Sequence, residues 1–248
     1  MKTRTICLFL LVSLLISSCS ALTNLGVKVI TPSKVVISEN RNVSGFNAIE
    51  FSTVGKVNII QGDQESLNIS GPDNLVPEIS TTVTGNTLII KNKENISISS
   101  LSSDNMLTFT IVAKDLTSLS VSGAGDVQVE SFSPASMDLN LSGAGNVQVN
   151  QLSTGTLKIN LSGIGGLDIS GQATSATIDI SGAGNVSAAD LQLNTANISI
   201  SGVGGAKLWV TGQMTGNISG AGTVSYYGTP QTSFNTSGLG SFKSLGNK

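Results

Sequence analysis

The feature that most constrains the fold of this chain is a four-residue unit, Ser-Gly-apolar-Gly, which returns about every twenty residues in its second half. Two examples are VSGAGDVQVE at 121–130 and LSGAGNVQVN at 141–150. The first glycines of the seven units are Gly123, Gly143, Gly163, Gly182, Gly202, Gly220 and Gly238. A period near twenty that is repeated this often indicates a solenoid, in which each repeat forms one coil stacked on the last.

The residues on both sides of each unit alternate between apolar and polar. The fourth residue after each first glycine is apolar: Val127, Val147, Leu167, Val186, Ala206, Val224 and Phe242. Because side chains alternate between the two faces of a strand, each flank is expected to be a strand with one face in the core. Each repeat is therefore a strand, a corner and a second strand.

The corner itself is expected to contribute to the core. We expect its apolar residue to point inward, and the glycines around it to provide backbone angles that a side chain would forbid. The corner residues are Ala124, Ala144, Ile164, Ala183, Val203, Ala221 and Leu239. A second column, three residues before each glycine, is polar and predicts a hydrogen-bonded ladder on the outer face. Its members are Ser120, Asn140, Asn160, Asp179, Ser199, Asn217 and Asn235.

Glycine-rich connections of this length also form hairpins, which would give an antiparallel meander instead. Columns of like residues twenty apart suit parallel, in-register stacking better, because each residue then meets its counterpart on the next coil. We therefore predict an all-β chain whose residues 114–248 form a parallel β-helix-like solenoid. Residues 41–113 alternate in the same way but with an irregular period, and are predicted to be decorated first coils that cap the N-terminal edge.

The N-terminus is typical of an export signal. Lys2 and Arg4 precede an apolar stretch that is too short to span a bilayer comfortably. The stretch ends at Ile16-Ser17-Ser18-Cys19, which resembles the bacterial lipobox. We predict a lipoprotein signal peptide over 1–18 and a lipidated Cys19 followed by a tether to residue 40; an ordinary signal peptide is the alternative. Ser20 in place of Asp favours the outer membrane, with the protein facing either the periplasm or the cell surface.

The composition excludes several classes of function. The chain has no His and a net charge of −2, and Arg41 is the single Arg after the predicted signal. It therefore has no basic stripe for nucleic acid. Its carboxylates are spread along the coils, so no catalytic cluster is expected. Of the residues three positions after each corner glycine, only Asp126 is acidic, whereas a calcium-binding roll needs an Asp that recurs from coil to coil. We expect no catalytic residues, no metal and no cofactor.

One exposed aromatic pair is a candidate binding site. Trp209, which is the only Trp, is expected to point outward, with Tyr227 one coil away and Lys207 beside them. An aromatic platform of this kind suits a glycan or an envelope or host protein. The alternative is that the tail from Phe242 to Lys248 folds over both rings and caps the rod.

The chain also resembles the head GIN domain family of bacterial adhesin-type proteins. The resemblance begins at RNVSGFNAI (41–49) and continues through VNIIQG (57–62), GPDNL (71–75) and GNTLII (85–90) into the Ser-Gly-apolar-Gly units. It implies a right-handed β-helix-like fold and a bacterial envelope location, often as a lipoprotein. It implies no catalytic residues.

Three functions follow in order of preference. The first is a non-enzymatic, lipid-anchored cell-envelope protein that serves as an adhesin-type binding or structural module. The second is a periplasmic structural or stress-related lipoprotein. The third is an enzyme that acts on polysaccharide, since parallel β-helices include such enzymes.

Overall fold

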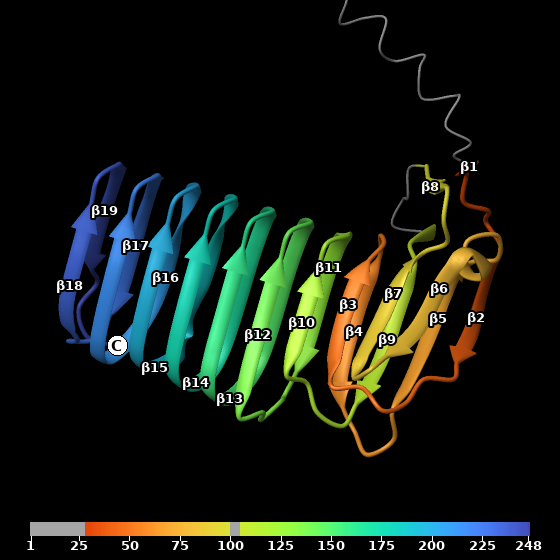
Figure 1. The fold of residues 1–248 in the computed structure, drawn as a ribbon, viewed down its shortest axis with the longest axis horizontal. Helices are drawn as coiled ribbons and strands as arrows, with labels where there is room; N and C mark the ends of the chain where they lie inside the picture. Colours follow the sequence, from red (N-terminus) through yellow and green to blue (C-terminus); the bar gives the residue numbers. More distant parts are fainter. Residues whose placement is uncertain (1–27, 100–104) are drawn as a thin grey trace, which may run out of the picture.

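The computed structural model describes residues 28–99 and 105–248. The predicted signal peptide and Cys19 lie outside these residues. The described chain forms a rod, with stacked coils along most of its length and a block of further strands at the N-terminal end (Figure 1). No helix within the described ranges is long and apolar enough to cross a membrane.

The stacked coils are about 20 residues long and form a β-solenoid of about six turns, which confirms the predicted solenoid. The strands of this part are β10 (Ser118–Val121), β11 (Ala124–Glu130), β12 (Ser136–Leu141), β13 (Ala144–Leu161), β14 (Ile164–Ile180), β15 (Ala183–Ile200), β16 (Val203–Ile218), β17 (Ala221–Tyr227), β18 (Gln231–Thr236) and β19 (Leu239–Ser244). Strands β13 to β16 each run through most of a coil, from one corner to the next.

The coils pair in parallel and bring equivalent residues together. Val127 pairs with Val147, and Val147 with Leu167. On the other flank, Ile159 pairs with Ile178, and Ile178 with Ile198. The parallel solenoid is therefore confirmed, and the antiparallel meander is wrong for this part of the chain. These six side chains are each at most 2% exposed, and burial of such apolar columns stabilises the stack.

The corner residues do not enter the core, and this expectation was wrong. Ile164, Val203 and Leu239 are 68%, 63% and 87% exposed. The reason is that the glycines, and not the residue between them, face the preceding coil. A Cβ on Gly143 would lie 1.9 Å from the carbonyl oxygen of Gly123, and a Cβ on Gly145 would lie 1.8 Å from that of Gly125. With both glycines against backbone, the residue between them points outward.

The two glycines of a corner have different reasons to be glycine. The second has a positive φ in several corners, for example +150° at Gly145 and +148° at Gly165. The first has to be glycine because a Cβ there would clash with a backbone carbonyl group of the preceding coil. The expectation that both glycines serve backbone angles therefore holds for the second one in these corners.

The polar column forms part of the predicted ladder. Asn160 Nδ2 donates to Asn140 Oδ1 at 2.7 Å, and Asn140 Nδ2 donates to Ser120 Oγ at 3.5 Å. At the far end of the rod, Asn235 Nδ2 donates to Asn217 Oδ1 at 3.1 Å. These side chains link neighbouring coils along the outer face.

The N-terminal block begins as a continuation of the solenoid and ends in antiparallel strands. Its strands are β1 (Lys28–Ile30), β2 (Val36–Arg41), β3 (Ala48–Ser52), β4 (Lys56–Gln61), β5 (Ser66–Pro72), β6 (Ile79–Thr84), β7 (Thr87–Asn92), β8 (Ile96–Ile98) and β9 (Thr108–Ala113), with a short 3-10 helix at Val76–Glu78. Strands β3 and β4 stack in parallel on β10 and β11, and β7 and β9 stack on β3 and β4. Strands β2, β5 and β6 pair antiparallel with their neighbours. Turning the chain back on itself in this way covers the edge that a parallel stack leaves open.

Candidate functional site

The structure brings the three predicted platform residues together near the C-terminal end of the rod. Trp209 of β16 and Tyr227 of β17 occupy paired positions on neighbouring strands. Lys207 Nζ lies 5.3 Å from the centroid of the Tyr227 ring. Both rings are partly exposed. A cation at this distance from an aromatic face is attracted by the ring quadrupole, so Lys207 helps to hold Tyr227 in place.

The C-terminal tail reaches the same platform. Lys248 Nζ lies 4.9 Å from the centroid of the Trp209 ring. The same ammonium group donates to Asp190 Oδ1 at 2.5 Å and to the Ala189 carbonyl oxygen. The hydrogen bond and charge of Lys248 hold the pKa of Asp190 below its usual value. The tail is guided there by two backbone bonds, from Leu245 N to Tyr226 O and from Gly228 N to Gly246 O.

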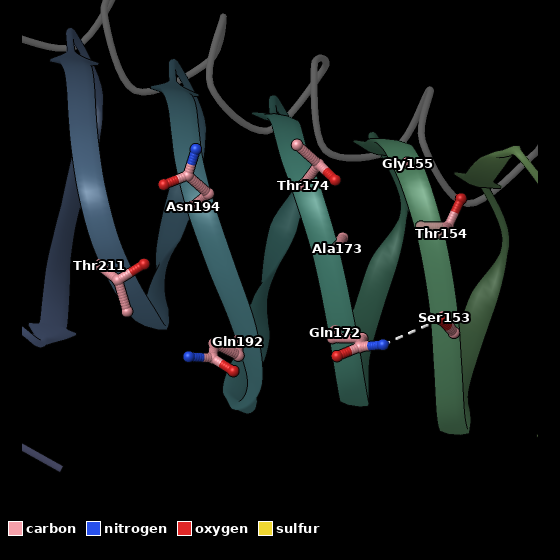
Figure 2. A pocket seen from close by; sticks show the side chains of 9 residues that line it. All are labelled: Ser153, Thr154, Gly155, Gln172, Ala173, Thr174, Gln192, Asn194 and Thr211. Atoms are coloured by element: carbon pink, nitrogen blue, oxygen red, sulfur yellow. Dashed lines mark hydrogen bonds between the residues drawn. The ribbon is translucent and has the colours of Figure 1, made fainter.

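A shallow groove of about 540 Å³ lies next to this platform and crosses β13 to β16 (Figure 2). Its lining residues are all uncharged: Ser153, Thr154, Gly155, Gln172, Ala173, Thr174, Gln192, Asn194 and Thr211. Gln172 Nε2 donates to Ser153 Oγ at 3.2 Å. The groove therefore presents neutral hydroxyl and amide groups from four coils, each able to donate or accept hydrogen bonds.

Strand register makes the groove and the platform one continuous surface. Ser153 pairs with Gln172, Gln172 with Gln192, and Gln192 with Trp209. Tyr227 follows Trp209 on the next strand. Paired residues of parallel strands point to the same face, so this column runs from two glutamines to two aromatic rings. We call these five residues, Ser153, Gln172, Gln192, Trp209 and Tyr227, the binding column.

Counting along the sequence did not find Gln192 or Gln172. Counting seven residues from each corner glycine puts Ala189 beside Trp209, but the register shifts between Ala188 and Gln192 and puts Gln192 there instead. The sequence holds one signal of this shift, because Gly182 and Gly202 are 20 residues apart whereas Gly202 and Gly220 are 18 apart. A longer coil stacked on a shorter one has to accommodate extra residues as a bulge.

The side chains of this surface are suited to binding a ligand. The groove lining has no charged side chain, and Lys207 and the Lys248–Asp190 pair lie at the aromatic platform. Within residues 28–99 and 105–248, no group of three His, Cys, Asp or Glu side chains could hold a metal ion. The surface can stack on a ring and exchange neutral hydrogen bonds, which suits recognition of an uncharged polar ligand.

Together, the fold and this surface define a β-solenoid that presents a neutral polar groove with an aromatic end. Residues 45–230 match the family model described as "Putative auto-transporter adhesin, head GIN domain". The chain belongs to this family, as the resemblance in its sequence predicted. Membership in an adhesin-like family indicates a secreted or cell-envelope protein.

Solved structures support the assignment. A crystal structure of a "putative adhesin" from Bacteroides fragilis is 30% identical, with a TM-score of 0.83, over 87% of this chain and 100% of that one. A "putative adhesin" from Parabacteroides merdae is 20% identical, with a TM-score of 0.70, over 88% and 99%. A "putative lipid binding protein" from Parabacteroides distasonis is 21% identical, with a TM-score of 0.69, over 88% and 100%. The last two show a shared fold. No curated protein matches the chain.

Proposed function

We propose that this protein is a non-enzymatic, lipid-anchored adhesin of the cell envelope, and that its binding column recognises a neutral glycan. The observation that carries the proposal is the register of β14 to β16, which sets the amides of Gln172 and Gln192 in line with the ring of Trp209. A sugar has an apolar C–H face and a rim of hydroxyl groups. The indole ring fits the first, and the amide and hydroxyl groups of the groove fit the second.

The charge of the surface favours an uncharged glycan over an acidic one. The groove lining is neutral, and the ammonium group of Lys248 is already paired with Asp190. In our proposal a sugar ring stacks on Trp209 in place of Lys248. Lys248 can leave without exposing a buried charge, because both it and Asp190 are accessible to water.

The proposed anchor is a lipid on Cys19. Lys28, the first residue of β1, follows Cys19 by nine positions. A Cys19→Ala variant of the full chain should move from the membrane fraction to the soluble fraction. If the variant stayed wholly in the membrane fraction, the anchor would not depend on Cys19.

Glycan binding can be measured with the protein's own fluorescence, because Trp209 is the only Trp. Purified protein is titrated with neutral and acidic oligosaccharides, and calorimetry gives the affinity of variants that lack the fluorophore. Trp209→Ala should abolish binding of the best neutral ligand, and Gln192→Ala should weaken it at least about tenfold, since one lost hydrogen-bonding group leaves its sugar partner unsatisfied. Gln128→Ala, the matched change on β11 outside the groove, should have no effect.

The proposal fails if Trp209→Ala binds as tightly as the wild type, or if no neutral oligosaccharide binds. Cleavage of the oligosaccharides by the wild type would instead favour the polysaccharide-acting enzyme.

A further inference from the structure

The corner residues, all exposed except the partly buried Ala221, form a continuous line along the rod, which we call the corner ridge. Its members are Ala124, Ala144, Ile164, Ala183, Val203, Ala221 and Leu239. The three large ones, Ile164, Val203 and Leu239, are 68%, 63% and 87% exposed, although their chemistry suits a core. Every second coil from Ile164 onward thus carries a protruding aliphatic side chain, and the coils between carry Ala. An exposed apolar line of this length marks a contact surface.

The surroundings of the ridge are uncharged over most of its length. A Ser lies two residues before each ridge residue. The position two residues after it holds Asp126 in the first corner and then Asn146, Gly166, Asn185, Gly205, Thr223 and Ser241. A shallow groove of about 670 Å³ lies along the ridge in the first coils. Ser142, Ala144 and Ile164 are among the residues that line it. A surface with small neutral groups around aliphatic side chains can approach an apolar medium without burying a charge.

The N-terminal strand lies on the same side of the rod as the corners. Figure 1 shows the corners along one long edge, with β1 at that edge and the end of the chain at Lys248 near the opposite edge. Strand β1 carries Val29, which is 65% exposed. The nine residues from Cys19 to Lys28 can span at most about 30 Å when fully extended. A lipid on Cys19 would therefore hold this edge of the rod within reach of the bilayer.

We propose that the corner ridge is a lipid-contact surface, and that the anchored rod lies with Ile164, Val203 and Leu239 in the headgroup region of the membrane. The inference rests on the lipid anchor of the proposed function. Neighbouring large side chains on the ridge are two coils apart, or roughly 10 Å. A contact made of such isolated side chains is shallow, and it needs an anchor to keep the rod near the surface.

This orientation leaves the binding column free. Trp209 follows Val203 by six residues in β16, and Tyr227 follows Ala221 by six residues in β17. Six residues of strand span about 20 Å. With the ridge on the bilayer, the aromatic rings lie on the side of the rod that faces away from it.

Single-cysteine labelling tests the proposal in the lipidated full-length protein. The only native cysteines are Cys7, in the predicted signal, and Cys19, whose thiol the lipid would occupy. A cysteine introduced by Ile164→Cys or Val203→Cys is then the only free thiol. Each is labelled with a polarity-sensitive fluorophore, and the protein is reconstituted in phosphatidylethanolamine–phosphatidylglycerol vesicles with or without lipids brominated near the headgroup. Thr174→Cys, an exposed groove position, is the control.

We expect brominated lipid to reduce the emission of both ridge labels at least about twofold and to leave the Thr174→Cys label unchanged. If the protein floats with the vesicles and neither ridge label is quenched, the ridge proposal is overturned although the anchor stands. Energy transfer between labels on different molecules, without quenching by brominated lipid, would show that the ridge contacts a second copy of the protein. This energy transfer would depend on protein concentration, and it would also overturn the ridge proposal. If mass spectrometry finds no lipid on Cys19, the proposed anchor fails first, and the ridge proposal fails with it.

Discussion

Gln192 and Trp209 occupy paired positions on neighbouring coils, although Gln192 comes three residues later than Trp209 when each is counted from its own corner glycine. The bulge that follows Ala188 absorbs the difference. It places an amide in line with an indole ring and pushes Ala189 and Asp190 outward, where both meet Lys248. One local irregularity thus builds both the binding column and the docking point of the tail.

The contact between Lys248 and Asp190 should be sensitive to acid. The pKa of Asp190 is lowered by its hydrogen bond and ion pair with Lys248. The contact is therefore fully present above the unfolded pKa, near 4, and is lost as the pH falls through the lowered value. We expect the emission of Trp209 to change in a step below about pH 4.

The control for this prediction is Asp190→Asn, which should show no such step while far-UV circular dichroism stays constant. The same step in Asp190→Asn would show that another group moves the tail.

The second glycine of a corner should not tolerate a side chain. In Gly145→Ala the new Cβ would lie 1.8 Å from the carbonyl oxygen of Gly125, at a φ of +150°. Because the obstacle is backbone, neighbouring coils have to separate, and we expect a loss of at least about 3 kcal/mol in the free energy of unfolding. Urea denaturation measures it.

Gly85→Ala measures the cost of a left-handed backbone conformation where no steric obstacle is present. Gly85 also has a positive φ, +62°, but a Cβ there would meet nothing within 4 Å. The loss should be about 1 kcal/mol, the cost of the left-handed conformation alone. Equal losses in the two variants would contradict the steric role of the stacked carbonyl groups.

Urea denaturation can test whether the corner residues lie outside the core. Ile164 is 68% exposed, whereas Ile159, five residues earlier, is fully buried. Ile164→Ser should change the free energy of unfolding by less than about 0.5 kcal/mol. Ile159→Ser should cost more than about 3 kcal/mol, because it removes buried apolar surface and buries a hydroxyl. A large loss in Ile164→Ser would mean that the corner residue is part of the core.

The ladder of amides should contribute a smaller amount. Asn140 accepts a bond from Asn160 and donates one to Ser120. Asn140→Ala removes both, and because the site is only partly buried we expect a loss of about 1 kcal/mol, measured by the same denaturation. No loss would show that water replaces these bonds at no cost.

The coils could be predicted from the sequence because two simple patterns coincide. Residues such as Val147 and Ile159 alternate with polar residues, and their counterparts recur about twenty residues away. Periodicity of this kind reports the inward face of each strand directly.

The direction of Ile164 could not be predicted in the same way. An apolar residue between two glycines fits either side of a bend, and the choice depends on the backbone of the preceding coil, which the glycines touch. The pairing of Gln192 with Trp209 also depends on a neighbouring coil. The bulge after Ala188 forms because β15 stacks on a shorter coil, so one coil's sequence alone does not predict it. The antiparallel strands β2, β5 and β6 lie in the part of the chain where the period is irregular.

An adhesin has to meet its ligand outside the cell, so the most direct measurement is antibody access to an epitope tag fused after Lys248, in intact and in permeabilised cells. A tag is preferable to protease treatment, because a stacked solenoid resists cleavage wherever it lies. Our proposal predicts labelling of intact cells close to the level in permeabilised cells. Labelling only after permeabilisation would contradict it and would favour the periplasmic structural lipoprotein.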